Sequence, residues 1–284
     1  MIKEETITTE SELIKKLNEL EKLTDLWVFR GEANSDWKLN TTIDRISQSI
    51  GLFPFSEQES IFHVIRTKRI YDELRDINSE NYLEILSFLQ HHGVPTRLLD
   101  FTKSPYIALY FAFEDLSPNS DFASIYGFQP SFFRMKLYDC INRQKEKIKS
   151  KIEPKSYQSE FINWGHIDNF QKLYNEILQS DAINLVLPVE PDIFNKRIFI
   201  QQGLFFLQGN SNLSFIENLE IYYPSDIEQN TFKINISRNL QKSIILKLAN
   251  MGITPYSLYP GLEGLMKDMK LNLYRNHYKI FGTE

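Results

Sequence analysis

Two segments of the chain place groups that could do chemistry next to strongly apolar stretches. The first is Trp27-Val28-Phe29-Arg30-Gly31. A guanidinium at the end of a strand, beside a glycine that lets backbone come close, suits bidentate contact with a phosphate or a ribose hydroxyl. An ion pair at the strand terminus is the structural alternative for Arg30, and the sequence leaves both interpretations open.

The second segment, residues 89–112, is denser in polar groups. Its two histidines end a helix, a turn at 93–95 follows, and three apolar residues (Leu98, Leu99 and Phe101) anchor the following loop to the core. The polar positions are His91, His92, Thr96, Arg97, Asp100, Thr102 and Ser104.

Three interpretations of this second segment are open. A metal site is disfavoured, because adjacent histidines rarely point to one centre and no local Asp, Glu or His spacing completes a ligand set. Arg97 and Asp100 would form an ion pair that braces the loop. The segment would also serve as the wall of a ligand pocket, with a histidine as donor or base and Thr102 or Ser104 as hydrogen-bond partners. The last two interpretations are compatible.

Two later stretches carry weaker signals. Residues 195–206 have the pattern strand, polar turn, strand, with Gln202 near the turn. Glu263 lies in the first turn of a final helix, where the helix dipole favours an acid whatever the function. The chain contains no phosphate-binding P-loop, no dinucleotide GxGxxG and no nucleophile-elbow GxSxG motif.

Composition bounds the class of protein. The chain has 284 residues, of which 42% are hydrophobic, and this excludes disorder over most of its length. The net charge of -5 gives no overall basic field toward nucleic acid or membrane. Cys140 is the single cysteine, so an intrachain disulfide is excluded and no cysteine-built metal site is expected. The sequence has no signal-peptide pattern and no membrane-spanning apolar run, which predicts a cytoplasmic protein without a membrane partner. No pattern in the sequence indicates an oligomeric state.

The element pattern favours an α+β fold, because helices cluster early in the chain and strands later. A capping box at Thr9 predicts the first helix, and Ser104-Pro105 predicts the start of another. Further helices are expected from Ser56, over 82–90, from Ser237 to Met251 and from Leu262. Strands are expected at 26–29, 122–128, 183–189, 197–200, 203–207 and 231–236. We expect one domain over 1–284, with an exposed helical insertion at 140–180.

Taken together, the motifs resemble the FRG domain family, which is named for its Phe-Arg-Gly motif and occurs in bacteria and their phages. The resemblance rests on Phe29-Arg30-Gly31, on the block from His92 to Ala112, on the turn at 197–203 and on the terminal stretch 252–260. A bacterial effector in phage defence or toxin systems is the setting that the family implies.

A more distant resemblance is to ADP-ribosyltransferases of the arginine-serine-glutamate class. Their strand ending in Arg-Gly is similar to Arg30-Gly31, and their Ser-Thr-Ser motif with the following helix is similar to residues 100–112. Their glutamate strand, turn and Phe-containing strand resemble residues 197–205. The resemblance implies a helical N-terminal half packed on a mostly antiparallel split sheet, with NAD as substrate and no metal.

One departure affects the chemistry that this resemblance implies. The catalytic glutamate of that class aligns with Arg197 here, and cleavage of the nicotinamide–ribose bond needs a carboxylate facing a developing cation. Either another acid takes the role, in the order Glu263, Glu190 and Asp100, or the pocket binds nucleotide without cleaving it.

The resemblance then implies a role for each candidate residue. Arg30, with Gly31 beside it, would hold the phosphate or ribose, and His92 and Thr102 would position ribose or nicotinamide. Gln202 would line the acceptor side. The remaining wall residues would be His91, Thr96, Arg97, Asp100 and Ser104.

Three functions follow, in order of preference. The first is an ADP-ribosyltransferase-like or NAD-cleaving effector with a protein, a nucleic acid or water as acceptor. The second is a binding module that senses a nucleotide or nucleic acid without chemistry. The third, a nuclease with His91 or His92 as base, lacks both a metal-carboxylate cluster and a basic surface.

Overall fold

A seven-stranded sheet forms the centre of the computed structural model, with strand order β1-β7-β4-β2-β3-β6-β5. The structure describes residues 2–24, 26–50, 57–115, 119–144, 167–176, 178–180, 183–191, 195–223 and 226–281. The strands are β1 (Lys3–Ile7), β2 (Val28–Glu32), β3 (Leu98–Thr102), β4 (Phe122–Phe128), β5 (Val186–Val189), β6 (Gly203–Gln208) and β7 (Thr231–Ser237).

The sheet consists of two blocks that meet at one point. Strands β1, β7, β4 and β2 form one block, and β3, β6 and β5 form the other. Strands β2 and β3 share a single registered pair, Phe29 with Thr102, whereas β2 pairs with β4 over five residues. Every pairing is antiparallel except that of β1 with β7. The expected mixture of helices with a mostly antiparallel sheet is therefore confirmed.

Helices surround both blocks. They are α1 (Glu10–Glu21), α2 (Thr42–Ile50), α3 (Glu57–Thr67), α4 (Tyr82–His91), α5 (Pro105–Phe113), α6 (Pro130–Gln144), α7 (Ile167–Glu176), α8 (Lys196–Ile200), α9 (Phe215–Tyr222), α10 (Ile227–Asn230), α11 (Gln241–Asn250), α12 (Pro255–Leu258) and α13 (Leu262–Phe281). The capping box at Thr9 is present, and the Ser104 hydroxyl accepts from the Ile107 N–H at the start of α5, so both sequence-based helix starts are confirmed.

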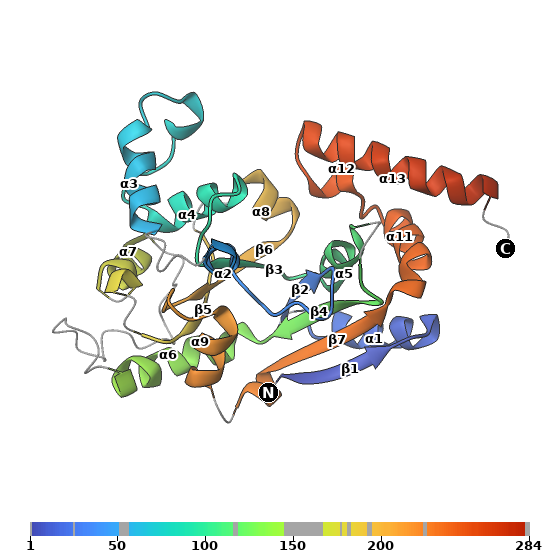
Figure 1. Cartoon of the computed structure of the whole chain (residues 1–284), viewed down its shortest axis with the longest axis horizontal. Coiled ribbons are helices and arrows are strands. Elements are labelled where there is room, and N and C mark those ends of the chain that lie inside the picture. Colours follow the sequence, from blue (N-terminus) through green and yellow to red (C-terminus); the bar gives the residue numbers. More distant parts are fainter. Residues whose placement is uncertain are drawn as a thin grey trace.

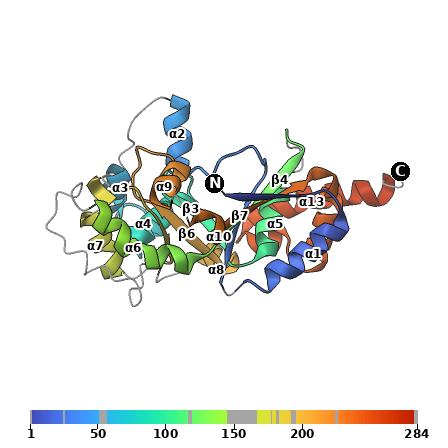
Figure 2. The same cartoon turned by 90° about the horizontal axis from the view of Figure 1, so that it is seen from below.

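Two hydrophobic cores pack on the sheet, and one of them extends across both blocks through Val28 of β2 and Phe128 of β4. One core joins Phe29 of β2 and Ile125 of β4 to α1, α5 and α11. The other joins Phe101 of β3 and Phe206 of β6 to α3, α4, α6, α7 and α9. Two perpendicular views show α3, α4, α6 and α7 on one side of the molecule and α1, α5 and α13 on the other (Figures 1 and 2). The junction of the two blocks lies between these groups of helices.

The structure corrects several expectations about elements. Residues 98–102 form strand β3 rather than a loop, because all five residues pair with β6. Residues 197–200 lie in helix α8 rather than a strand, because Asn195 caps that helix by accepting from the Ile198 N–H. The expectation that strands cluster late in the chain is also wrong, since β1, β2 and β3 all precede residue 103. The expected helix start at Ser56 lies outside the described residues.

The segment 140–180 is only partly described. Residues 145–166, 177 and 181–182 of this region and its flank lie outside the described residues. Cys140 in α6 and Phe170 and Tyr174 in α7 are buried in the core, so the described helical parts are not the exposed insertion that the composition predicted. Within the described part of the chain, no helix is both long and apolar enough to cross a membrane.

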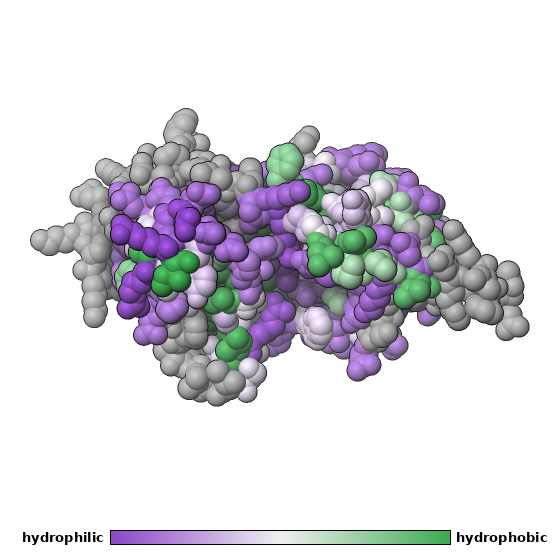
Figure 3. Space-filling view, turned by 90° about the horizontal axis from the view of Figure 1, so that it is seen from above, coloured by the Kyte–Doolittle hydropathy of each residue, from purple (hydrophilic) through white to green (hydrophobic). Residues whose placement is uncertain are grey.

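Helix α13 differs from the other helices in what it exposes. Leu271 on its inner side is buried, but a group of large apolar residues on its outer side faces solvent. They are Leu262, Leu265, Met266, Met269 and Leu273, with exposed fractions of 42–74%. Figure 3 shows apolar side chains gathered over this part of the molecule.

Candidate functional site

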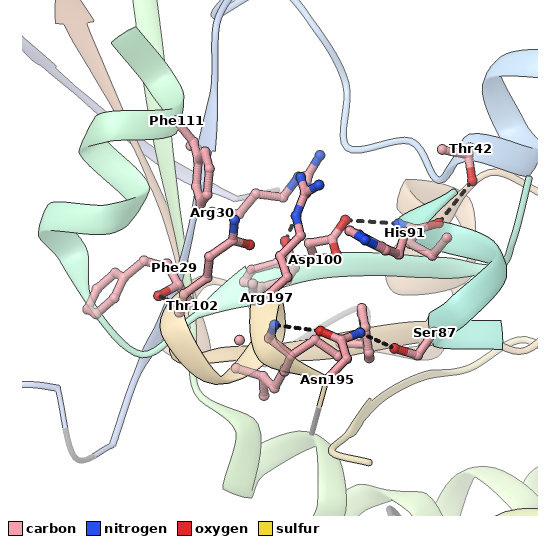
Figure 4. Close-up of a pocket in the computed structure, with 18 of the residues that line it drawn as sticks. Phe29, Arg30, Thr42, Ser87, His91, Asp100, Thr102, Phe111, Asn195 and Arg197 are labelled. Atoms are coloured by element: carbon pink, nitrogen blue, oxygen red, sulfur yellow. Dashed lines mark hydrogen bonds between the residues drawn. The ribbon is translucent and has the colours of Figure 1, made fainter. Parts of the chain in front are cut away.

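A cavity of about 340 Å³ opens where the two blocks of the sheet meet. Its size lies in the range of about 300–1,000 Å³ typical of ligand pockets. Figure 4 shows side chains from β2, β3, α4, α5 and α8 around it. The lining residues are Phe29, Arg30, Gly31, Thr42, Arg45, Ser87, Gln90, His91, Asp100, Phe101, Thr102, Phe111, Asn195, Arg197, Ile198, Gln201, Gly203, Leu204, Phe205 and Tyr259.

Arg30 reaches the cavity from β2 with its guanidinium fixed by two protein acceptors. Its Nε donates to the Glu32 carboxylate at 2.7 Å, and its Nη1 donates to the Asp100 carbonyl oxygen at 2.8 Å. Both side chains of the ion pair are largely buried. The ion-pair interpretation of Arg30 is therefore right, and it is compatible with ligand contact because no described residue accepts from Nη2. A pre-oriented fork of this kind loses little entropy when it binds an anion.

Gly31 lines the cavity, but its lack of a side chain serves packing rather than ligand approach. A Cβ at this position would overlap the carbonyl oxygen of Ala108 and approach the Ala112 nitrogen at 2.6 Å. Helix α5 therefore packs directly on the backbone of β2. This contact brings Phe111 of α5 to the cavity wall.

Asp100 is the acidic residue of the wall, and it belongs to a polar chain that starts in the core. The Thr96 hydroxyl donates to the Gln90 side-chain oxygen at 2.6 Å, and the Gln90 nitrogen donates to the Asp100 carboxylate at 2.8 Å. Thr96 is fully buried and does not line the cavity. It orients Gln90, which in turn orients Asp100.

The two histidines at the end of α4 have different surroundings. His91 lines the cavity, while the His92 ring packs on Phe88 with centroids 4.3 Å apart and lies outside the wall. Burial, together with the nearby charge of Arg197, lowers the pKa of His91 below 6.5. His91 is therefore neutral at pH 7 and able to donate or accept one proton.

Arg97 points away from the cavity and braces the fold. Its Nε and its backbone N–H both donate to Glu57, each at 2.5 Å, and Nη1 donates to the Gly209 carbonyl oxygen at 3.0 Å. The expected brace exists, but the partner is Glu57 rather than Asp100. The sequence did not reveal this partner because Glu57 lies forty positions away, on α3.

A hydrogen bond joins the end of β3 to the turn before β6 at the cavity wall. Thr102 lines the wall and donates its hydroxyl hydrogen to the Gln201 carbonyl oxygen at 2.7 Å. Gln201 rather than Gln202 faces the cavity; Gln202 has a left-handed φ of 50° and lines a neighbouring pocket beside Lys103 and Glu190. Ser104 caps α5 and does not line the cavity.

Arg197 enters the wall from α8, a helix where the sequence pattern predicted a strand. Its guanidinium lies 4.9 Å from the centre of the Tyr259 ring, a cation–π distance, and 3.6 Å from the Glu263 carboxylate. Glu263 also pairs with Lys267 at 3.3 Å and is not part of the wall. Tyr259 and Asn195 are lining residues that the sequence analysis missed, because the helical turns that place them could not be read from periodicity.

Arginines outnumber acidic residues on the cavity wall although the chain is acidic overall. Arg30, Arg45 and Arg197 line it, with Asp100 as the acidic residue among the lining positions. The Phe111 and Tyr259 rings and the Arg197 guanidinium offer flat surfaces for stacking. The wall is suited to an anionic ligand that carries a planar ring. Within the described residues, no group of three or more His, Cys, Asp or Glu could hold a metal ion.

Comparison with known proteins supports part of the motif pattern. Residues 25–121 match the family model of the FRG domain, a range that includes Arg30, His91, Asp100 and Thr102. No curated protein and no solved structure matches the chain. The stretches at 197–203 and 252–260 lie outside the matched range. Residues 25–121 thus resemble an FRG domain, and this range supplies most of the cavity wall.

Proposed function

We propose that the cavity binds NAD and that the chain is an ADP-ribosyltransferase-like or NAD-cleaving enzyme. The observation that carries the proposal is the convergence of Arg30, Arg45 and Arg197 with aromatic rings and a neutral histidine at the junction of the sheet. Such a wall complements a diphosphate joined to planar rings. An effector role in phage defence or toxin systems is the setting that the resemblance implies.

Arg30 is the proposed phosphate anchor. Its Nε and Nη1 are held by Glu32 and by the Asp100 carbonyl group, so Nη2 keeps a fixed direction. The Arg97 guanidinium, by contrast, donates hydrogen bonds to Glu57 and to two carbonyl oxygens in the core. Arg97 is therefore not proposed as a ligand contact.

Asp100 replaces Glu263 as the first candidate for the carboxylate. When the nicotinamide–ribose bond breaks, its electron pair goes to the ring nitrogen and positive charge develops at the ribose carbon. A carboxylate in the wall stabilises that charge, and water or an acceptor group then adds its oxygen or nitrogen to the carbon and loses a proton. Asp100 lines the cavity, whereas Glu263 is paired with Arg197 and Lys267 outside it.

A binding module without chemistry is the second candidate, and one observation favours it. The Asp100 carboxylate already accepts a hydrogen bond from Gln90, and the rest of the wall is cationic or neutral. Such a wall holds a nucleotide well and stabilises a developing cation poorly. The proposed ligand is the same in both cases.

The test is incubation of the purified chain with NAD, with and without cell lysate as a source of acceptor, while nicotinamide release is followed by chromatography. Arg30→Ala is expected to abolish binding and release, and Asp100→Asn to keep binding but lose release. Arg75→Ala is the matched control, because Arg75 is 64% exposed and pairs only with Asp72 on the surface.

The outcomes separate the two candidates. Release that depends on Asp100 supports the enzyme. Binding that depends on Arg30, seen as a thermal shift without release, supports the binding module. Absence of both binding and release in the wild-type chain contradicts both.

A further inference from the structure

The outer face of α13 is the most apolar exposed surface on a helix in the described part of the chain. Leu262, Leu265, Met266, Met269 and Leu273 recur at spacings of three and four, which places them on one side of the helix. Leu262 and Leu273 are 70% and 74% exposed. Contiguous apolar patches on soluble monomers are usually small, and larger ones mark interaction sites.

The opposite side of α13 packs against the rest of the protein. Leu271 is buried, and a Cβ at Gly264 would overlap the Tyr259 carbonyl oxygen, so the inner face packs closely on α12. Lys267 reaches inward to the Glu114 carboxylate at 2.7 Å. The apolar outer stripe therefore cannot be buried by rotating the helix.

We propose that the outer face of α13 binds the same face of a second copy of the chain, with the two helices antiparallel. The observation that selects this occupant is charge: Glu263 and Lys270 lie seven positions apart on the same edge of the stripe. In an antiparallel pair with a twofold axis between residues 266 and 267, Glu263 of each copy faces the partner's Lys270. A parallel pair would place this edge of the two copies on opposite sides of the seam, so Glu263 could not meet the partner's Lys270.

The proposed pairing also has a consequence for the cavity. Glu263 and Lys267 stand beside Arg197 and the Tyr259 ring, so a partner that fixes α13 would also fix this part of the wall. The proposal does not depend on which nucleotide binds there, or on whether it is cleaved.

Sedimentation velocity over a range of protein concentrations tests the association. The wild-type chain is expected to form dimers, and Met269→Glu to raise the dimer dissociation constant on the order of tenfold or more, because a carboxylate would lose its hydration in an apolar interface. Ile221→Glu on α9 is the matched control, since Ile221 is 54% exposed and Met269 is 55% exposed. It should leave association unchanged.

Charge reversal tests the orientation. Lys270→Glu and Glu263→Lys should each weaken the dimer, and the double variant should restore it. A short bismaleimide should cross-link Met266→Cys, which lies near the proposed axis, but not Leu273→Cys, whose two copies would lie about 20 Å apart at a rise of about 1.5 Å per residue. The native Cys140 is buried and does not interfere.

A wild-type chain that remains monomeric, a dimer equally insensitive to Met269→Glu and Ile221→Glu, or cross-linking at Leu273→Cys as readily as at Met266→Cys would each overturn the proposal. Circular dichroism of every variant separates loss of association from loss of folding.

Discussion

Arg30 has both a structural contact and a position at the candidate site. It forms a buried ion pair with Glu32, and it also lines the cavity. The ion pair supplies orientation, because it fixes the plane of the guanidinium before a ligand arrives. At the scale of single residues, function here depends on how a side chain is held as much as on its charge.

Replacement of Arg30 by Lys tests that view. Lysine keeps the charge but carries its three donors on one nitrogen, so it does not reproduce the separate Nε, Nη1 and Nη2 positions from which Arg30 reaches Glu32, the Asp100 carbonyl group and a phosphate. We expect the affinity for NAD to fall on the order of tenfold or more. Isothermal titration calorimetry measures this loss, and Arg75→Lys serves as the control. Unchanged affinity would mean that Arg30 acts only on stability.

His91 gives the site a pH dependence whose sign can be derived. Its pKa is lowered in the free protein, and a bound phosphate would raise it because the anion favours the imidazolium. Binding then takes up a proton, so affinity for the nucleotide should increase as the pH falls from neutrality toward the lowered pKa of His91 in the free protein. Titrations across this range should lose that slope in His91→Gln and keep it in the control His63→Gln, a position on α3 away from the cavity. A slope that survives in His91→Gln would assign the proton to another group.

At the scale of elements, the site depends on two close contacts that hold the surrounding helices and strands together. One is the packing of α5 on β2 at Gly31, and the other is the attachment of α3 to the start of β3 through Glu57 and Arg97. Both hold the elements that carry lining residues. Loss of either contact should therefore displace or unfold the elements that carry the lining residues.

Gly31→Ala should be strongly destabilising, because the new methyl group would meet the backbone of α5, which cannot move away without disrupting its packing. Gly203→Ala is the matched control, since a Cβ there would lie 3.4 Å from the Ile198 side chain, an ordinary contact. Thermal unfolding should show a large drop in melting temperature for the first variant and a small one for the second. Similar melting temperatures would show that α5 has room to shift.

Glu57→Gln should lower the free energy of unfolding by about 1.5–3 kcal/mol, because it removes a charged partner that accepts from the buried Arg97 guanidinium. Asp72→Asn, which breaks the exposed pair with Arg75, should have no measurable effect. Urea unfolding monitored by circular dichroism provides both values. Equal stability of the two variants would show that Arg97 finds another acceptor.

At the scale of the whole molecule, the two blocks of the sheet meet at a single registered residue pair between β2 and β3. The cavity lies at this junction, with Arg30 on one block of the sheet and Asp100 on the other. A ligand that contacts both residues therefore links the two halves. It should stabilise the chain as one unit.

NAD at about 100 times its dissociation constant should add about 2.7 kcal/mol to the free energy of unfolding. Hydrogen exchange should slow in β2 and in α8 together, because the proposed ligand contacts both. Protection confined to one block would place the ligand on one side of the junction only. Arg30→Ala, which removes the proposed anchor, should abolish the protection.

The sequence by itself determined the local features. Apolar spacing predicted α4, and the Ser104 cap predicted α5. The dense polar segment 91–104 marked the correct part of the chain, since His91, Asp100 and Thr102 do line the cavity. Signals of this kind depend on neighbours within one helical turn or one strand.

Only the tertiary structure decided which polar residues face the cavity. Arg97 pairs with Glu57, and the His92 ring packs on Phe88, so neither side chain lines the cavity. Arg197 reaches the wall from a five-residue helix where the pattern predicted a strand. The physical reason is that burial and pairing partners are set by contacts between residues far apart in the chain. Arg30 and Asp100 are seventy positions apart in the sequence and share a hydrogen bond of 2.8 Å in the fold.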